Sequence, residues 1–512
     1  MSDIAQQAAP EAEAAPYRWR WVAFVVVLAG SVMDLLDSLA TNVAGPSIRA
    51  DIGGGSTLLQ WLLAGYTLAM AIGLITGGRL GDLYGRRRVL LVGMAGFTLG
   101  SILCSIATQP GELIAFRVVQ GLFGAIMLPQ GFGVIRASFP PKELPAAFGA
   151  FGPVMGLSSV GGPVLAGWLI GADYLGTGWR MIFLINAPIG LAAFLVGLRF
   201  LPRTQEATAS RLDIVGAVLV AAAAGLLVYP VVQGRELGWP AWTFLLMVAS
   251  VVVFTVFGWY EVRMQSRGRD PLVIPALFSK RAFTGGLISG LTFFTALVGF
   301  SLVLTVYLQL GLGYSPLKAG LTVLPQALGS VAGFVAASAG LAAKLGRTLI
   351  HAGTAAIALG LAGVYLTLDE VTAPLTPWQL APALALTGIG MGLVLAPFFD
   401  IILSGVEPAE TGSASGSLTA IQQFGSALGA AVLGTVFFDL LTRNLHAQAS
   451  QPAFTRTLEQ TLWVAVALQA ATFALAFLLP RRARPQWDGV PGLGNGTSPD
   501  GSQATTPATE PA

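Results

Sequence analysis

Long apolar stretches alternate with short polar segments over most of the 512 residues of the chain. A helix needs about 20 mostly apolar residues to cross the hydrocarbon core of a bilayer. The pattern therefore predicts fourteen transmembrane helices, at residues 21–44, 58–79, 89–107, 112–135, 145–171, 179–201, 212–232, 242–261, 283–308, 317–342, 348–368, 378–403, 412–438 and 460–479.

These spans are predicted to be helices rather than strands. Backbone groups in lipid must find hydrogen-bond partners within their own segment or in a closed barrel. Strands of a membrane barrel would alternate apolar and polar positions over about ten residues, whereas this chain has continuous apolar runs. Composition agrees, because 10% of the residues are charged and soluble domains carry about 25%. We therefore expect an all-α membrane protein with the lipid bilayer as its surroundings.

Basic residues predict the orientation in the membrane. When the loops are numbered in order, 21 of the 28 Lys and Arg residues lie in the two tails and the even-numbered loops, and 6 lie in the odd-numbered loops. Lys and Arg concentrate in cytoplasmic loops, so both termini are predicted to be cytoplasmic. This distribution accounts for the net charge of +3, and we expect no nucleic-acid partner.

Few residues could support enzymatic chemistry. Cys104 is the single cysteine, and His351 and His446 have no cluster of potential metal ligands around them in the sequence. No lysine follows a glycine, so the sequence contains no G-K-[ST] phosphate loop that would bind ATP. We expect no metal and no cofactor, and a membrane-embedded enzyme is the less favoured class.

A polar segment at residues 78–88 separates the second and third apolar stretches. Its sequence, GRLGDLYGRRR, resembles the signature loop of the major facilitator superfamily, whose pattern is roughly G-x-L-[AG]-D-R-x-G-R-[RK]-x. Leu83 stands where the family usually has a basic residue. The resemblance implies a loop that gates the transport cycle, carried by Gly78, Gly81, Asp82, Gly85, Arg86 and Arg87.

Each residue type in this segment has a physical use. Gly81 and Gly85 are expected to permit a tight turn. Asp82 is expected to meet a helix N-terminus, whose dipole favours a negative charge. The arginines can pair with acidic groups or with lipid head groups. A basic loop that follows only the rule of positive charge in the cytoplasm remains the alternative.

A weaker copy of the segment occurs later, because residues 341–347 keep the Leu, Gly and Arg of residues 80–86 but lose the aspartate. Transporters of this superfamily contain two related six-helix halves. The resemblance therefore implies two six-helix bundles of the major facilitator fold plus an inserted pair of helices. The expected divisions are an N-terminal tail, a first bundle, the inserted pair with its linkers, a second bundle and a disordered tail, at residues 1–19, 20–202, 203–282, 283–480 and 481–512.

Six further stretches resemble the fourteen-helix branch of the drug:proton antiporters. They lie in expected helices 1, 4, 5, 6, 7 and 13, at residues 36–46, 116–121, 156–167, 179–190, 212–216 and 412–436. In that family the fifth helix lies between the halves and is associated with export. Its matching positions here are Gly156, Gly162, Pro163 and Gly167. Ordinary close packing through small residues is the alternative.

Charged residues deep inside apolar stretches are costly and usually line a water-filled path or form pairs. Asp34 and Asp37 lie three residues apart on one helix face. Burial and mutual repulsion favour the protonated form of a carboxyl, so both are candidates for proton coupling. A structural pair bonded to nearby hydroxyls is the alternative. Arg117 lies at a depth similar to that of Asp37, so we expect a buried ion pair that leaves Asp34 to titrate.

These observations lead to one expected function and its alternatives. The sequence predicts a monomeric, proton-coupled secondary transporter of the bacterial plasma (inner) membrane, a multidrug efflux protein typical of antibiotic resistance. It would export small amphiphilic molecules such as drugs, antibiotics or natural products, with the substrate and protons as its partners. A proton-coupled importer is the alternative within transport, and the fifth-helix motif weighs against it. A membrane scaffold would not need acidic residues deep in a helix.

Overall fold

The computed structural model describes residues 17–140, 142–203, 212–269, 271–370, 375–407, 410–447 and 449–481. Within these ranges the chain is helical and contains no strand. Fourteen helical segments of the described chain are long and apolar enough to cross a membrane, which confirms the number predicted from hydropathy. The disorder expected of the C-terminal tail concerns residues 482–512, which lie outside the described ranges.

The first six spans form the N-terminal half. Five are single helices, and the sixth is built from a 3₁₀ turn and two helices that follow one another. Their bounds are α1 (Arg20–Ile52), α2 (Ser56–Tyr84), α3 (Arg86–Ile106), α4 (Pro110–Ser138), α5 (Leu144–Ala172), then η1 (Tyr174–Gly176) before the sixth span of η2 (Gly178–Arg180), α6 (Met181–Leu184) and α7 (Asn186–Phe200).

The inserted pair and the C-terminal half supply the other eight spans. The inserted pair is α8 (Ile214–Gln233) and α9 (Ala241–Ser266), followed by the short α10 (Ala276–Ser279). The six C-terminal spans are α11 (Arg281–Val306) with η3 (Tyr307–Gly311); α12 (Pro316–Thr322) with α13 (Leu324–Ala336), η4 (Ala337–Leu341) and α14 (Ala342–Leu345); α15 (Arg347–Glu370); α16 (Pro377–Leu403); α17 (Thr411–Ala447); and α18 (Ser450–Leu475) with η5 (Ala476–Leu478).

Three helix ends differ from prediction by eight to ten residues. α1 continues to Ile52 instead of residue 44, α17 continues to Ala447 instead of residue 438, and α18 begins at Ser450 instead of residue 460. The added turns are polar, and that of α1 includes Arg49 and Asp51. A hydropathy pattern marks the part of a helix that suits lipid, whereas the hydrogen-bonded helix continues beyond it.

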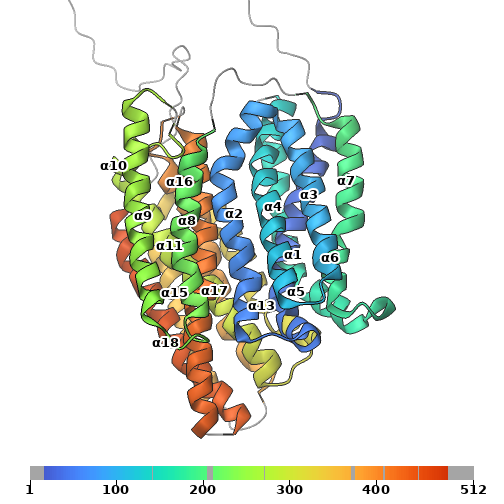
Figure 1. Ribbon diagram of the computed structural model, residues 1–512, viewed down its shortest axis with the longest axis vertical. Coiled ribbons are helices and arrows are strands. Elements are labelled where there is room, and N and C mark those ends of the chain that lie inside the picture. The colour runs from blue at the N-terminus through green and yellow to red at the C-terminus, as the bar shows by residue number, and fades with distance from the viewer. Residues whose placement is uncertain are drawn as a thin grey trace, which may run out of the picture.

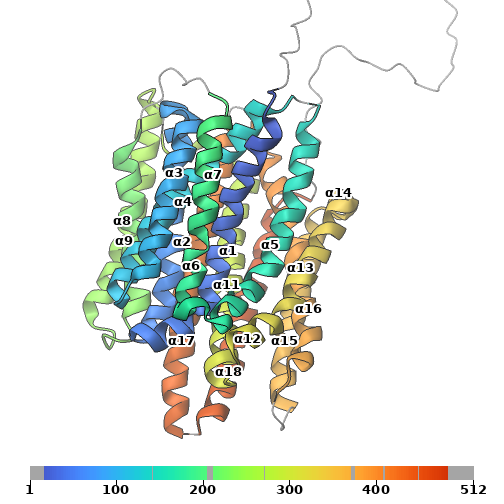
Figure 2. The same cartoon turned by 90° about the vertical axis from the view of Figure 1, so that its right-hand side faces the viewer.

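The two halves stand side by side, with the N-terminal half in blue to cyan and the C-terminal half in yellow to red (Figure 1). They meet along two seams, because α2 packs along α17 and α5 packs along α12 and α13. The inserted helix α8 packs against both α2 and α17, and α9 packs along α8. The inserted pair therefore covers the α2–α17 seam from outside, and the turned view in Figure 2 shows the pair at one edge of the bundle.

The two ends of the bundle can be distinguished by the connections they hold. At one end, named the loop end, α2 meets α3 at Gly85, and the hydroxyl of Tyr17 donates to the carbonyl of Phe200 at the end of α7. The backbone N–H of Arg347 there donates to the carbonyl of Arg481. The opposite end, named the far end, holds the α1–α2 connection. The described chain therefore begins and finishes at the loop end.

Candidate functional site

A buried ion pair lies in the middle of the N-terminal half. The Arg117 guanidinium on α4 donates to the Asp37 carboxylate on α1, and the exposed fractions of the two residues are 0% and 1%. The expected pair is therefore present. Arg117 Nε also donates to the carbonyl of Leu62 at 3.3 Å, and its guanidinium carbon lies 4.0 Å from the ring centroid of Tyr66. These contacts tie α4 to both α1 and α2.

Neutral polar side chains complete the shell around this pair. Gln120 lies one turn after Arg117; its carbonyl oxygen accepts from Arg117 Nη1 at 2.8 Å, and its amide donates to Asp37 Oδ1 at 2.9 Å. Asn186 on α7 donates to the same Asp37 oxygen at 3.2 Å, and both amides also donate to the Ser101 hydroxyl on α3. A buried charge is tolerated when its hydrogen bonds are satisfied. Within this shell, Arg117 Nη2 is a buried nitrogen with no hydrogen-bond partner among the described residues.

Asp34 has different surroundings although it lies one turn before Asp37. It is only partly buried, and the hydroxyl of the fully buried Tyr66 donates to its Oδ1. No Lys or Arg within the described chain forms a salt bridge with Asp34. Tyr66 therefore contacts Asp34 through its hydroxyl and the partner of Asp37, Arg117, through its ring.

The two aspartates lie at similar depth along α1. This helix has 33 residues, and its middle residue is Leu36. Asp34 and Asp37 therefore lie on either side of the helix midpoint, and depth does not distinguish them. Their partners do, because Asp37 has a cation and two amide donors whereas Asp34 has one phenol.

Four residues of this site were not singled out from the sequence. Gln120 and Asn186 lie inside the stretches that resemble the antiporter motifs of helices 4 and 6, so those motifs carried a usable signal. Tyr66 and Ser101 lie in apolar stretches with no pattern of their own. Only the packing of α2 and α3 against α4 brings them to the charged pair.

The segment at residues 78–88 is a helix junction rather than a polar loop. α2 continues to Tyr84, α3 begins at Arg86, and Gly85 alone separates them with a φ of 84°. The turn expected at Gly81 is wrong, because Gly81 is helical. A Cβ there would lie 1.7 Å from the side-chain oxygen of Gln130 on α4, so the glycine permits close helix packing.

The charged residues of the junction bind neighbouring helices. Asp82 was expected at a helix N-terminus; instead, it pairs across one turn with Arg86, the first residue of α3, at 3.2 Å. Both side chains are about 40% exposed. Arg87 donates to the carbonyl of Leu198 near the end of α7, whereas a Cβ on Gly78 would meet nothing within 4 Å.

The glycines of α5 lie against two different partners. A Cβ on Gly162 would lie 3.0 Å from Leu39 of α1, within the same half. A Cβ on Gly167 would lie 2.5 Å from the Leu317 Cα of α12, and one on Gly320 of α12 would lie 2.4 Å from the carbonyl oxygen of Pro163. Gly156 faces Val331 of α13 at 3.4 Å. The expected position of this helix between the halves is therefore observed.

Polar side chains also join the halves toward the far end. Asn42 of α1 donates to Ser301 of α11 at 2.8 Å, and Gln309 of η3 donates to the carbonyl of Val43 at 2.7 Å. Gln60 of α2 donates to the Ala431 carbonyl of α17 at 2.9 Å. With the close backbone approach at Gly167, these contacts hold the halves together at the far end in this conformation.

Comparisons with known proteins place the chain in a family. Residues 26–430 match the model of the Major Facilitator Superfamily. The chain is 42% identical to a probable actinorhodin transporter of Streptomyces coelicolor, over 92% of this chain and 93% of that protein. It is 36% identical to the puromycin resistance protein pur8 of Streptomyces alboniger, over 85% of each. It is also 32% identical to the tetracenomycin C resistance and export protein of Streptomyces glaucescens, over 81% of this chain and 76% of that one.

Solved structures agree on the fold. A proton-dependent oligopeptide transporter superposes with a TM-score of 0.62 at 15% identity, covering 90% of this chain and 99% of that chain. A bacterial homologue of the lysosomal transporter Spinster, in an inward-facing and occupied conformation, gives a TM-score of 0.60 at 14% identity, covering 90% of this chain and 96% of that chain. These structures show the same fold, and the family model together with the relatives above shows that the chain belongs to the major facilitator superfamily.

Proposed function

We propose that the protein is a proton-coupled exporter of small amphiphilic molecules, in which Asp34 carries the transported proton. The observation that carries the proposal is the contrast between two neighbouring carboxylates. Asp37 is held by a cation and two amides, whereas Asp34 has only the Tyr66 hydroxyl and remains partly accessible. A carboxylate without a cation can gain and lose a proton without breaking an ion pair.

In this proposal, the position of Tyr66 couples protonation of Asp34 to movement of the helices. Its hydroxyl donates to Asp34, and its ring packs on the Arg117 guanidinium. Protonation of Asp34 weakens the hydrogen bond from Tyr66, which frees the phenol to move against Arg117 and so loosens the α2–α4 contact. Since α2 packs along α17, that movement reaches the seam between the halves. Alternating access in this superfamily is largely a rocking of one half against the other.

The matched relatives support export as the direction of transport and small organic molecules as the substrate class. The names of the matched Streptomyces proteins refer to transport of actinorhodin, resistance to puromycin, and resistance to and export of tetracenomycin C. We infer a substrate of the same kind for this chain, a small organic molecule moved out of the cell. No single member of that group is favoured by the residues of the site.

The test is transport in proteoliposomes with an imposed pH gradient. Asp34→Asn is expected to abolish proton-driven efflux yet retain substrate counterflow, because the binding and rocking steps remain intact. Asp37→Asn is expected to impair both, since it strands Arg117. Asp400→Asn, which removes an exposed carboxyl near the end of α16, serves as the control. Full proton-driven efflux by Asp34→Asn would overturn the assignment of Asp34.

We also propose that the loop end faces the cytoplasm, with both termini there. Single cysteines are introduced into a Cys104→Ser background at Tyr84, which is 57% exposed at the loop end, and at Trp378, which is 82% exposed at the far end. An impermeant thiol reagent on whole cells is expected to label position 378 and to leave position 84 unlabelled. The reverse pattern would invert the topology. With the proposed orientation, the conformation described above is closed toward the outside.

A further inference from the structure

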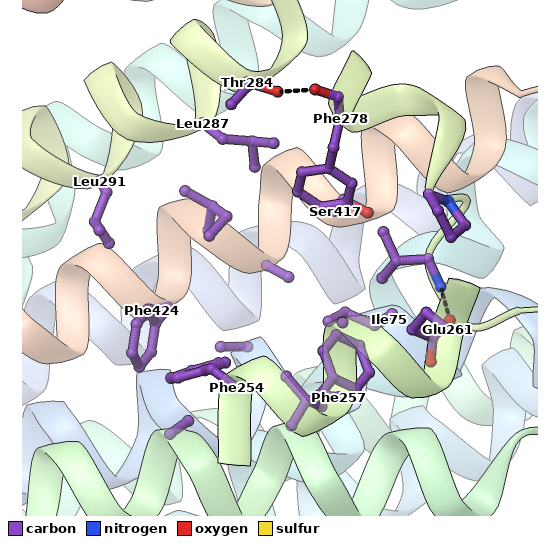
Figure 3. Close-up of a pocket in the computed structure, with 18 of the residues that line it drawn as sticks. Ile75, Phe254, Phe257, Glu261, Phe278, Thr284, Leu287, Leu291, Ser417 and Phe424 are labelled. Atoms are coloured by element: carbon purple, nitrogen blue, oxygen red, sulfur yellow. Dashed lines mark hydrogen bonds between the residues drawn. The ribbon is translucent and has the colours of Figure 1, made fainter. Parts of the chain in front are cut away.

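A large apolar cavity lies outside the α2–α17 seam, beneath the inserted helix pair. Its volume is about 640 Å³, within the range of ligand pockets. Its walls come from both halves and from the inserted pair; they are mostly aliphatic and include four phenylalanines, Phe254, Phe257, Phe278 and Phe424 (Figure 3). This cavity is separate from the charged site in the N-terminal half, which lies on α1, α3, α4 and α7 as well as α2.

The mouth of the cavity lies on the surface that faces lipid. Among its lining residues, Val262 of α9 is 55% exposed, Phe278 of α10 is 50% exposed and Ile288 of α11 is 43% exposed. Helix α9 packs along α8, and the cavity lies between α9 and α11, which both contribute lining residues. A molecule dissolved in the bilayer can therefore reach the cavity without crossing an aqueous loop.

One buried acidic residue breaks the apolar wall. Glu261 is 3% exposed; its Oε2 accepts from the backbone N–H of Val273 at 3.0 Å, and its Oε1 has no partner among the described residues. Figure 3 shows Glu261 at one end of the cavity. The Asp213 carboxyl lies beside this oxygen, and a buried carboxylate is costly unless a donor or a cation pairs with it, so a cationic group would stabilise this end of the cavity.

A second carboxyl faces the same point. Asp213 is 4% exposed; its Oδ1 accepts from the N–H of Gly216 and from the Tyr260 hydroxyl, and its Oδ2 has no described partner. A Cβ built on Gly216 would lie 2.4 Å from that Oδ2 and 2.6 Å from Glu261 Oε1. Two carboxyls in such proximity repel each other when both are ionised, so a donor between them lowers the free energy of the pair.

We propose that this cavity binds a lipophilic amine taken up from the adjacent leaflet, with its ammonium group at Glu261, the charged residue of the lining, and its apolar body among the phenylalanines; Asp213 lies behind Glu261 and adds to the negative charge there. Charge complementarity selects this occupant, because the lining residues include no Lys or Arg. Arg269, the cation near Tyr260, is exposed and outside the lining. The inference rests on the proposed export function, for which the cavity is a first docking site beside the seam.

The experiment measures binding by purified protein in lipid nanodiscs without a proton gradient, with empty nanodiscs as the blank. The probes are pyrenylmethylamine and methylpyrene, which share the aromatic body and differ in the amine. The wild-type protein is expected to bind the amine saturably and at least about tenfold more tightly than methylpyrene, the equivalent of one charge-assisted hydrogen bond. Equal affinity for the two probes would overturn the role of the carboxyls.

Two variants locate the binding, and each has a control. Gly258→Leu fills the cavity, because a Cβ there meets nothing within 4 Å, and it is expected to lower amine affinity at least about tenfold by displacing the aromatic body. Gly225→Leu on α8 also has open space but lies outside the cavity lining, so binding should be unchanged. Unchanged binding in Gly258→Leu would overturn the cavity as the site.

Glu261→Gln tests the charge while keeping an oxygen for the Val273 N–H. It is expected to lower amine affinity about tenfold and to leave methylpyrene affinity within about twofold. Glu459→Gln, a partly buried glutamate on α18, is the control and should change neither. Loss of affinity for both probes alike would identify a site for apolar chains such as lipid tails and overturn the amine proposal.

Transport assays separate this inference from the proposed function. If wild-type protein shows proton-driven efflux but Gly258→Leu binds the amine normally, the docking site is wrong and the export function stands. If the wild-type protein binds the amine at this cavity but shows no proton-driven efflux of any compound, the export function is wrong and the binding site stands.

Discussion

The two halves of the molecule share an architecture but differ in the chemistry of their cores. The N-terminal half buries Asp37 and Arg117 within a shell of amides, whereas the fully buried polar residues of the described C-terminal half are Thr, Ser and Gln. Phenylalanines fill much of the C-terminal core, with Phe293, Phe294 and Phe398 in edge-to-face contact. The buried charges of the two described halves are therefore concentrated in the N-terminal half, and the C-terminal half has an apolar, aromatic core.

The helix junctions of the two halves show what they have in common. Gly85 with a φ of 84° precedes Arg86 at the start of α3, and Gly346 with a φ of 54° precedes Arg347 at the start of α15. An arginine at each junction contacts the end of the last helix of its own half. Arg87 donates to Leu198, and Arg347 donates to the carbonyls of Phe477 and Leu479. The junction geometry is therefore retained where the aspartate is not.

The largest effect is expected from breaking the fully buried ion pair of the N-terminal half, which has no counterpart among the described residues of the C-terminal half. Arg117→Met leaves Asp37 buried without its cation, a loss of about 3–5 kcal/mol in comparable buried pairs. The thermal midpoint of unfolding in detergent is the measurement. Arg443→Met is the control, because that arginine pairs with Asp439 while 73% exposed and should contribute about 0–1 kcal/mol.

The double variant Asp37→Asn with Arg117→Gln sharpens this prediction. It removes both charges and keeps polar side chains for Gln120 and Asn186, so part of the lost stability should return through a favourable coupling energy. If the two single losses simply add, the ion pair is not the interaction that stabilises this half.

The second-largest effect is expected from a substitution at the seam between the halves. Gly167→Val places a side chain against the backbone of Leu317, and overpacking of this kind typically costs about 1–3 kcal/mol. Because the clash exists only while the far end is closed, the population should shift toward an open far end and efflux should slow about tenfold or more. Spin labels on α5 and α12 would report the separation.

The matched control lies one turn further along the same helix. Gly171→Val also adds a β-branched side chain to α5, but a Cβ there meets nothing within 4 Å. It should leave both the label distances and the efflux rate near wild type. If the two variants slowed efflux equally, the cause would be the lower helix propensity of valine and not the contact between the halves.

Features of this protein that depend on local sequence could be predicted, whereas most features that depend on contacts between distant helices could not. The number of helices was predictable because each apolar run is long enough to cross a bilayer. The Asp37–Arg117 pair was predictable because a charge inside such a run is costly unless it finds a partner. The place of Tyr66 beside Asp34 was not, since a tyrosine in an apolar run carries no such signal. Gly81 shows the same limit: its glycine suggested a turn, but the close approach of Gln130 explains it.

A smaller effect is expected from the arginines at the junctions. Arg347→Ala removes two charge-assisted bonds to carbonyls at the end of the last span and a cation–ring contact with Phe477. Each such bond contributes about 1.5–3 kcal/mol when well shielded, and Arg87→Ala removes only one described bond at a more exposed position. The thermal midpoint should therefore fall further for Arg347→Ala. A larger fall for Arg87→Ala would contradict the comparison of the junctions.

The smallest effect is expected at the junction position where only the N-terminal half carries an aspartate. Asp82 pairs with Arg86 at 3.2 Å in the N-terminal half, and Ala343 occupies the corresponding place in the C-terminal half. Both members of the pair are about 40% exposed, so Asp82→Asn should change stability by no more than about 1 kcal/mol. The pair still restrains the first turn of α3 against α2, so its loss should slow efflux severalfold at saturating substrate while the half-saturating concentration stays constant.

Ala343→Asp is the converse variant and should not alter the rate. Arg347 beside it already donates to carbonyls of the last span, and Lys344 is exposed to solvent. Equal initial rates for Asp82→Asn and wild type, at matched expression, would show that the aspartate has no gating role and that the two junctions are equivalent in function as well as in geometry.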